Sequence, residues 1–218
     1  MLNLEQHLPK TKMTNLQDDQ QVQFIELLQK LIGVSSFSKE EDKAADIIRK
    51  FLKSKKIPFE TKLNNTWAKN KHYNFLKPTI LLNSHIDTVK PVNGWNKDPF
   101  NATVEENKLF GLGSNDAGAA LISLLATFIH FYEKDDLKYN LIFAATSEEE
   151  ISGKNGIEQI EEITSACEFA IVGEPTEMKM AIAEKGLMVL DGEVKGKAGH
   201  AARNDGLNAI YLAMVDVQ

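Results

Sequence analysis

The chain has 218 residues, 43% of them hydrophobic and 26% charged, which is the composition of an ordinary globular protein. Its formal net charge is -6 and no basic patch stands out, so nucleic acid and anionic membrane surfaces are not expected as partners. Its single cysteine, Cys167, excludes an intrachain disulfide. A polar amino terminus and the lack of a membrane-length apolar run predict a cytoplasmic protein.

Apolar spacing predicts two helices in the amino-terminal part of the chain. The first runs from Asp18 to Leu31 and should end at Gly33. We expect the second to begin at Ser38, since Ser38 followed three residues later by Glu41 is the pattern of a capping box. Its buried face should hold Ala44, Ile47, Ile48, Phe51 and Leu52. Strands are then expected at residues 58–63 and around Trp67.

Three short apolar runs, at residues 79–82, 139–145 and 169–172, predict buried strands. A loop at 91–100, a hairpin at 101–112 and a helix from Ala117 to about Tyr132 should lie between the first two. A shorter helix at 156–163 should precede the third. This order predicts an α/β fold with a mixed, largely parallel central sheet flanked by helices.

The sequence pattern changes near Glu184, where we place a domain boundary. Residues 187–194 alternate apolar and polar positions, as a half-exposed strand does. A loop at 196–200 and a helix from Leu207 follow. We therefore expect residues 1–184 to form one domain, and residues 185–218 to begin a smaller α+β domain.

Each of the three buried strands runs directly into ionisable residues. The first is followed by His85 and Asp87, the second by the glutamates 148–150, and the third by Glu174. Chemistry in open α/β sheets gathers beyond the carboxyl ends of the strands. A cluster of carboxylates there is costly unless a positive charge lies among them, so the pattern predicts a divalent metal ion. Imidazole with carboxylates suits zinc, cobalt or manganese better than calcium.

Each part of this pattern also has an ordinary structural interpretation. His85 and Asp87 can be structural residues at a strand end, and Asp116 can cap the helix that follows it. The glutamates 148–150 can form a solvated loop. In the functional interpretation Asp116 bridges two metal ions, while adjacent glutamates divide metal binding and proton transfer. The stretch G-L-G-S-N-D at 111–116 is not a nucleotide loop, because it lacks the third glycine of the dinucleotide pattern and the lysine of a P-loop.

Five motifs fall in an order that resembles a known family. They are H-I-D at 85–87, G-L-G-S-N-D at 111–116, S-E-E-E at 147–150, G-E-P-T at 173–176 and G-K-A-G-H at 196–200. Together they resemble the zinc deacylases and peptidases that include acetylornithine deacetylase, succinyl-diaminopimelate desuccinylase, aminoacylase and carboxypeptidases. The likeness is greatest to the acetylornithine deacetylases and covers nearly everything after residue 20.

The resemblance implies two metal ions, zinc foremost and cobalt as the alternative. It implies that the first ion is held by His85 and Glu174, that Asp116 bridges the two, and that Glu150 binds the second. The peptide bond between Asp116 and Ala117 is expected to be cis. Family members are longer than this chain and supply a last metal-binding histidine after the second domain. No histidine follows His200 here, so we expect an amino-terminal part that is inactive on its own.

The resemblance also implies the catalytic roles. Asp87 would orient the ligands from behind, and Glu149 would act as general base. The smaller domain begun by residues 185–218 would be the lid domain of the family. From it, His200 would polarise the substrate carbonyl, often across a homodimer formed through that domain. A surface histidine in a loop is the alternative for His200.

The implied activity is removal of the acyl group from a small-molecule N-acyl amino acid, with N-acetylornithine in arginine biosynthesis as the expected substrate. A succinyl-diaminopimelate desuccinylase or a metallo-dipeptidase is the alternative within the same chemistry. A non-catalytic metal-binding protein is the alternative of another class.

Overall fold

The computed structural model describes residues 15–183, 185, 186, 188, 191–200, 202, 203 and 205–217. The described part divides into two units, Met1–Met178 and Lys179–Gln218. The strands of the first unit are β1 Glu60–Lys62, β2 Asn65–Lys69, β3 Thr79–His85, β4 Thr103–Glu105, β5 Lys108–Phe110, β6 Asn140–Thr146 and β7 Phe169–Val172.

The helices of the first unit are α1 Asn15–Ile32, α2 Asp42–Ser54, α3 Ala120–Tyr132 and α4 Glu161–Thr164. An irregular turn, Ser114–Ala119, leads into α3, and short 3-10 turns lie at Glu149–Ile151 and Ile157–Ile160. None of the helices in the described part of the chain is long and apolar enough to cross a membrane.

The main sheet is mixed, as predicted, with the strand order β1-β2-β6-β3-β7. β3 is central and pairs in parallel with β6 on one side and with β7 on the other. β2 pairs antiparallel with β6 and with β1. β4 and β5 form the separate hairpin predicted at 101–112. The parallel arrangement of β3, β6 and β7 brings their carboxyl ends to one edge of the sheet.

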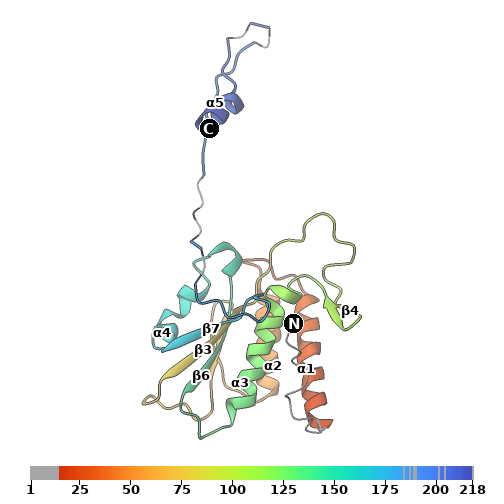
Figure 1. Cartoon of the computed structure of the whole chain (residues 1–218), viewed down its shortest axis with the longest axis vertical. Coiled ribbons are helices and arrows are strands. Elements are labelled where there is room, and N and C mark those ends of the chain that lie inside the picture. Colours follow the sequence, from red (N-terminus) through yellow and green to blue (C-terminus); the bar gives the residue numbers. More distant parts are fainter. Residues whose placement is uncertain are drawn as a thin grey trace, which may run out of the picture. The chain divides into compact units, whose positions relative to one another are not determined.

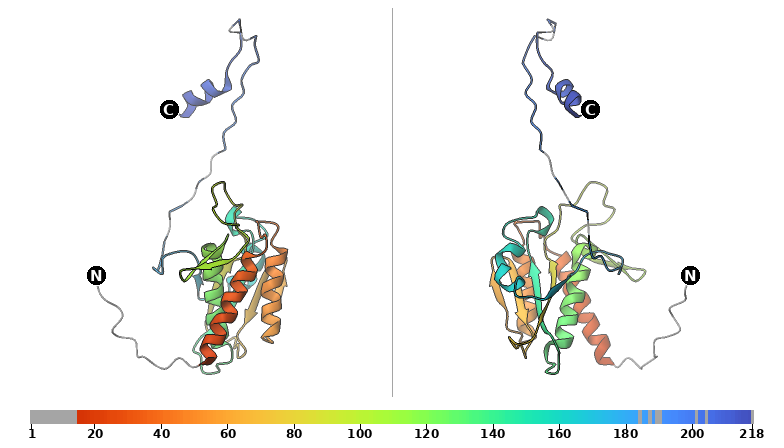
Figure 2. Two further views of the ribbon diagram at one scale, coloured as in Figure 1. Left: turned by 90° about the vertical axis from the view of Figure 1, so that its right-hand side faces the viewer. Right: turned by 60° about the vertical axis from the view of Figure 1, so that its left-hand side comes forward.

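The central strands β3 and β6 are buried on both faces. Successive side chains of a strand point to opposite sides, so each strand contributes to two cores. Leu82 and Phe143 belong to the larger core, which also contains residues of α1, α2 and α3. Leu81 and Ile142 belong to the smaller core with Ile160 on the other face. Figures 1 and 2 show α1, α2 and α3 together on one side of the sheet. β6 is buried along its whole length, which explains its continuous apolar sequence.

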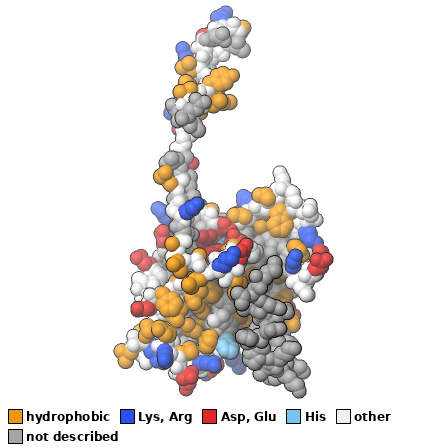
Figure 3. Space-filling model, in the orientation of Figure 1, with side chains coloured by type: hydrophobic (Ala, Val, Ile, Leu, Met, Phe, Trp, Pro, Cys, Tyr) orange, Lys and Arg blue, Asp and Glu red, His pale blue; other side chains and the backbone are white. Residues whose placement is uncertain are grey.

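Three expectations about the first unit need correction. β7 is not buried: its side chains are exposed, and among the described residues it is an edge strand that pairs with β3 alone. Hydrophobic side chains gather on the face that Figure 3 shows, and Phe169, Ile171 and Val172 of β7 are among the exposed ones. The second helix begins at Asp42 and is preceded by Glu41 rather than capped by Ser38. α3 begins at Ala120, after the irregular turn.

The second unit contains helix α5, Ala209–Val217, where a helix was predicted from Leu207. An isolated bridge joins Lys197 to Leu207. The strand predicted at 187–194 falls partly outside the described residues, and those described in that range (188 and 191–194) are not in a strand. The boundary near Glu184 and the lid role of residues 185–218 stay predictions.

We predict that the core around β6 dominates the stability of the first unit. Phe143 is 0% exposed and its ring lies 6.0 Å from that of Phe128. Phe143→Ala should therefore lower the free energy of unfolding by about 3–5 kcal/mol in urea denaturation. Phe75→Ala removes the same group from a side chain that is 90% exposed. This control should change the free energy of unfolding by less than about 0.5 kcal/mol. Equal losses for the two variants would contradict this assignment of the core.

Candidate metal centre

The predicted site residues of the first unit meet at the carboxyl edge of the sheet. His85 is the last residue of β3 and pairs with Thr146, the last residue of β6. The glutamates 148–150 follow β6, and Glu174 follows β7 after Gly173. Asp116 reaches the same place from the turn before α3. Parallel pairing is the reason that residues far apart in the sequence converge here.

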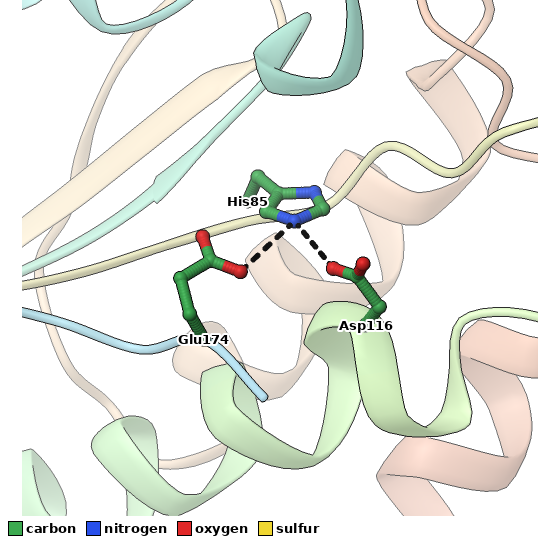
Figure 4. A group of neighbouring side chains, drawn as sticks. All are labelled: His85, Asp116 and Glu174. Atoms are coloured by element: carbon green, nitrogen blue, oxygen red, sulfur yellow. Dashed lines mark hydrogen bonds and ion pairs between the residues drawn. The ribbon is translucent and has the colours of Figure 1, made fainter. Parts of the chain in front are cut away.

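The imidazole of His85 is the centre of this group. Its side chain is 1% exposed, and its Nδ1 lies 2.9 Å from the carbonyl oxygen of Asp87. A carbonyl oxygen can only accept, so Nδ1 carries a proton and donates it. Nε2 then faces Asp116 Oδ1 at 3.2 Å and Glu174 Oε2 at 3.8 Å (Figure 4). Ligand atoms of these three residues all lie within 4.8 Å of one another.

The charges around His85 favour a positive charge at Nε2. Burial alone would lower the pKa of His85, but the hydrogen bond to Asp87 and the charges of Asp87, Glu174 and Glu149 outweigh it and raise the pKa to about 9. A group of carboxylates that binds a proton this strongly also suits a metal ion. One imidazole nitrogen and several carboxylate oxygens form a donor set that fits zinc, cobalt or manganese. The residues present therefore fit the predicted metal.

The remaining carboxylates of the group differ in exposure. Glu149 Oε2 lies 3.7 Å from His85 Nε2, and the Glu149 side chain is 54% exposed. Burial and the charge of Asp116 raise the pKa of Glu150, while His85 acts in the opposite direction. Burial also raises the pKa of Glu174, again against the effect of His85. Of these, Glu149 combines proximity to Nε2 with the greatest access from solvent.

Asp87 holds the site together from behind. Its side chain is 0% exposed, and Oδ1 lies 3.3 Å from His85 Nδ1. Oδ1 also accepts the Glu149 amide at 3.0 Å, while Oδ2 accepts the Glu150 amide at 3.1 Å and the Ser38 hydroxyl at 2.8 Å. Burial alone would raise the pKa of Asp87, but the hydrogen bonds from His85, Ser38 and Glu149 hold it below its ordinary value. The carboxylate is thus ionised and supports both His85 and the turn that contains Glu148, Glu149 and Glu150, called the glutamate turn below.

Ser38 and Glu41 are the residues that sequence reasoning missed. The spacing was interpreted as a capping box, but the Ser38 hydroxyl bonds to Asp87, and Glu41 accepts the amides of Lys39 and Glu148. Glu41 is 1% exposed, which is rare for a carboxylate at a helix start. The Ser-x-x-Glu pattern was the available signal, and the error lay in assigning it a purely local role.

Glu148 lies apart from the other glutamates of its run. It is 4% exposed, and its side chain accepts the Asn155 side-chain amide at 2.7 Å. Its carboxylate therefore points into the protein, toward Asn155. The Asp116–Ala117 peptide bond is cis, as expected.

The glycines of the 111–118 stretch make room for the scaffold around the site. Gly113 has φ 72, and a Cβ there would lie 2.6 Å from Thr88 Cγ2. A Cβ on Gly118 would lie 2.5 Å from the Gly113 carbonyl oxygen. These two glycines thus allow neighbouring protein atoms to approach the backbone closely.

His200 belongs to the second unit and is exposed. Its amide donates to Asp205 Oδ1 at 2.7 Å, and its Nδ1 accepts the Ala202 amide at 3.2 Å. These contacts shape a local loop. The catalytic role of His200 stays a prediction.

Comparison with known proteins identifies the family to which the chain belongs. The signature of Peptidase family M20/M25/M40 matches residues 81–209, which is more than half of the chain and includes every predicted site residue. The chain belongs to this family. Members of the M20 family are metal-dependent hydrolases, in agreement with the donor set around His85.

Two curated M20 relatives are similar over most of the chain. The succinyl-diaminopimelate desuccinylase of Buchnera aphidicola is 31% identical over 195 residues, covering 82% of this chain and 50% of the relative. The acetylornithine deacetylase of Photorhabdus laumondii is 31% identical over 202 residues, covering 87% and 52%. The chain thus spans about half the length of these relatives.

A solved structure shares the fold. It is a dinuclear metal-binding M20 peptidase from Bacillus subtilis with a TM-score of 0.54 and 18% identity, over 71% of this chain and 43% of that one. At this identity the likeness supports the α/β architecture with a mixed sheet, and no finer property.

We predict that Asp87 is needed for metal binding although its carboxylate is turned toward the backbone. Asp87→Asn replaces one acceptor oxygen by a donor that faces an amide or a hydroxyl, so the glutamate turn and His85 lose their support. Zinc affinity should fall by about 10–100-fold, measured by titration against a competing chelator. The control is Asp98→Asn, since exposed Asp98 accepts the Phe100 amide within the loop at 91–100. Unchanged zinc affinity in Asp87→Asn would refute the supporting role.

Proposed function

We propose that the protein is a metal-dependent amidohydrolase that removes the acyl group from an N-acyl amino acid, with N-acetylornithine as its substrate. The observation that carries the proposal is the position of His85 Nε2, which faces carboxylate oxygens of Asp116, Glu149 and Glu174 at 3.2 to 3.8 Å. Membership of the M20 family and the names of the two curated relatives support the reaction type.

In this proposal the cluster holds two zinc ions, with cobalt as an alternative. His85 and Glu174 would hold the first ion, Glu150 would hold the second, and the carboxylate of Asp116 would be available to both. Metal ions in such a site lower the pKa of water and polarise a carbonyl oxygen. The rest of the chemistry falls to side chains of this chain.

Glu149 is the proposed general base. Its carboxylate is close to His85 Nε2 yet half exposed, so a water molecule and a substrate can reach it. It takes the proton from the attacking water as the new carbon–oxygen bond forms at the acyl carbon. It then passes this proton to the nitrogen of the breaking amide bond, and the products are a free carboxylate and a free amino group.

Two further residues have proposed roles in the reaction. Asp87 keeps Nδ1 of His85 protonated and fixes the amides of Glu149 and Glu150, which orients the base toward the substrate. His200 is the proposed donor to the carbonyl oxygen as negative charge develops there. The resemblance suggests that it acts across a homodimer paired through the second unit.

The acyl group and the amino acid can be identified by a substrate panel. A succinyl-diaminopimelate desuccinylase is the second candidate, because a curated relative with that name is equally similar. The panel would compare N-acetylornithine, N-succinyl-diaminopimelate and a dipeptide with the full-length protein. A higher kcat/KM for either of the last two would replace the proposed substrate within the same chemistry.

We predict that Glu149→Gln abolishes turnover without emptying the metal site. The amide of glutamine cannot accept the proton of water, so kcat should fall by about 10²–10⁴-fold. Metal content, measured by atomic emission after dialysis, should stay close to that of the wild type because Glu149 is not a proposed ligand.

The matched control is Glu162→Gln, an exposed glutamate on α4. It should leave both kcat and metal content unchanged. A fully active Glu149→Gln protein would show that another group is the base. Loss of metal in Glu149→Gln would instead make this residue a ligand.

A further inference from the structure

The buried carboxylate of Glu41 connects three separate segments of the chain. Its Oε1 accepts the Lys39 amide at 2.7 Å and the Glu148 amide at 3.2 Å, and its Oε2 accepts the Asn64 side-chain amide at 3.0 Å. A carboxylate that is 1% exposed needs such donors, since a buried charge without partners is strongly destabilising. Within the described chain these bonds tie the start of α2 to the turn after β6.

The Glu148 amide is the first of three successive amides that carboxylates hold. It donates to Glu41, while the amides of Glu149 and Glu150 donate to Oδ1 and Oδ2 of Asp87. The two carboxylates are themselves linked, because Ser38 bonds to Asp87 and lies three residues before Glu41. The side chains of Ser38, Glu41 and Asp87 thus together support the backbone that carries Glu149 and Glu150.

The backbone of Glu148 needs this support. It has φ 53 and ψ 28, in the left-handed region that side chains other than glycine rarely adopt. This conformation turns the Glu148 side chain inward to Asn155, while Glu149 points toward His85. A looser turn would misdirect Glu149, since small displacements of a catalytic group reduce rates strongly.

We propose that Glu41 is a positioning residue, which acts through the Glu148 backbone to aim Glu149 and Glu150 at the metal centre. This inference rests on the proposed function where it concerns catalysis. Its geometric part, that Glu41 immobilises residues 148–150, does not depend on which reaction the protein performs.

The test compares Glu41→Gln with the wild type in the full-length protein. Glutamine has the shape of glutamate, so the variant is expected to fold. Its neutral carbonyl oxygen accepts the amides of Lys39 and Glu148 more weakly than a carboxylate does, so residues 147–152 should be held less firmly. Hydrogen–deuterium exchange of a peptide covering residues 147–152 should accelerate about tenfold, while distant peptides keep their rates. With N-acetylornithine, kcat should fall about tenfold or more and KM should stay within about threefold.

Two control variants separate positioning from general stability. Glu40→Gln neutralises the exposed neighbour and should match the wild type in both measurements. Ile48→Val removes one methylene from the buried face of α2, so it should speed exchange broadly without changing kcat. Should Glu41→Gln fail to fold, Glu41→Asp keeps the charge but shortens the side chain, and the same local acceleration is expected.

Exchange of residues 147–152 at the Glu40→Gln rate in the Glu41 variant would overturn the proposal, as would a kcat within about twofold of the wild type. Failure of the proposed function looks different. The wild type would then hydrolyse no N-acyl amino acid, while the exchange measurement would still decide whether Glu41 holds the turn.

Discussion

The carboxylate of Asp87 is the interaction on which the rest of the site depends. It is fully buried, and its partners are the imidazole of His85, the hydroxyl of Ser38 and the amides of Glu149 and Glu150. An ionised carboxylate in such a place is stable only because both oxygens accept hydrogen bonds and the imidazole of His85 lies beside them. In return it fixes which nitrogen of His85 faces the cluster and where the glutamate turn begins. One side chain that touches no proposed metal position thereby aligns ligands from two strands.

The sheet explains why these groups can meet at all. β3 pairs in parallel with β6 and β7, so three strand ends share one edge, and the turn before α3 adds Asp116 from the side. The apolar runs of β3 and β6 lie between the two cores of the first unit. Stability and site geometry therefore have the same origin: burial holds β3 and β6 rigid, and ionisable residues follow at their carboxyl ends. A cluster of like charges is tolerated there because it is arranged around a single cationic position.

Much of this arrangement could be predicted from the sequence, but the contacts of Ser38 and Glu41 and the exposure of β7 could not. The convergence of His85 and Glu174 was predictable because the carboxyl ends of parallel strands meet at one edge of a sheet, and Asp116 joins them through the motifs that match a family. The hydrogen bonds of Ser38 and Glu41 were not predictable, since the Ser-x-x-Glu pattern already has a local explanation. Their partners, Asp87 and Glu148, lie 49 and 107 positions further along the sequence. The exposure of β7 was missed for a related reason. An apolar sequence predicts a strand whose faces can be buried, but it does not tell whether other described residues pack against those faces.

The most direct test of the account is anomalous diffraction from crystals of the full-length protein grown with zinc. We expect a zinc peak at bonding distance, about 2.0–2.2 Å, from Nε2 of His85 and from carboxylate oxygens of Asp116 and Glu174. The Asp87 carboxylate should still accept the amides of Glu149 and Glu150. Zinc bound elsewhere, with Nε2 of His85 in contact with protein atoms alone, would contradict the central claim.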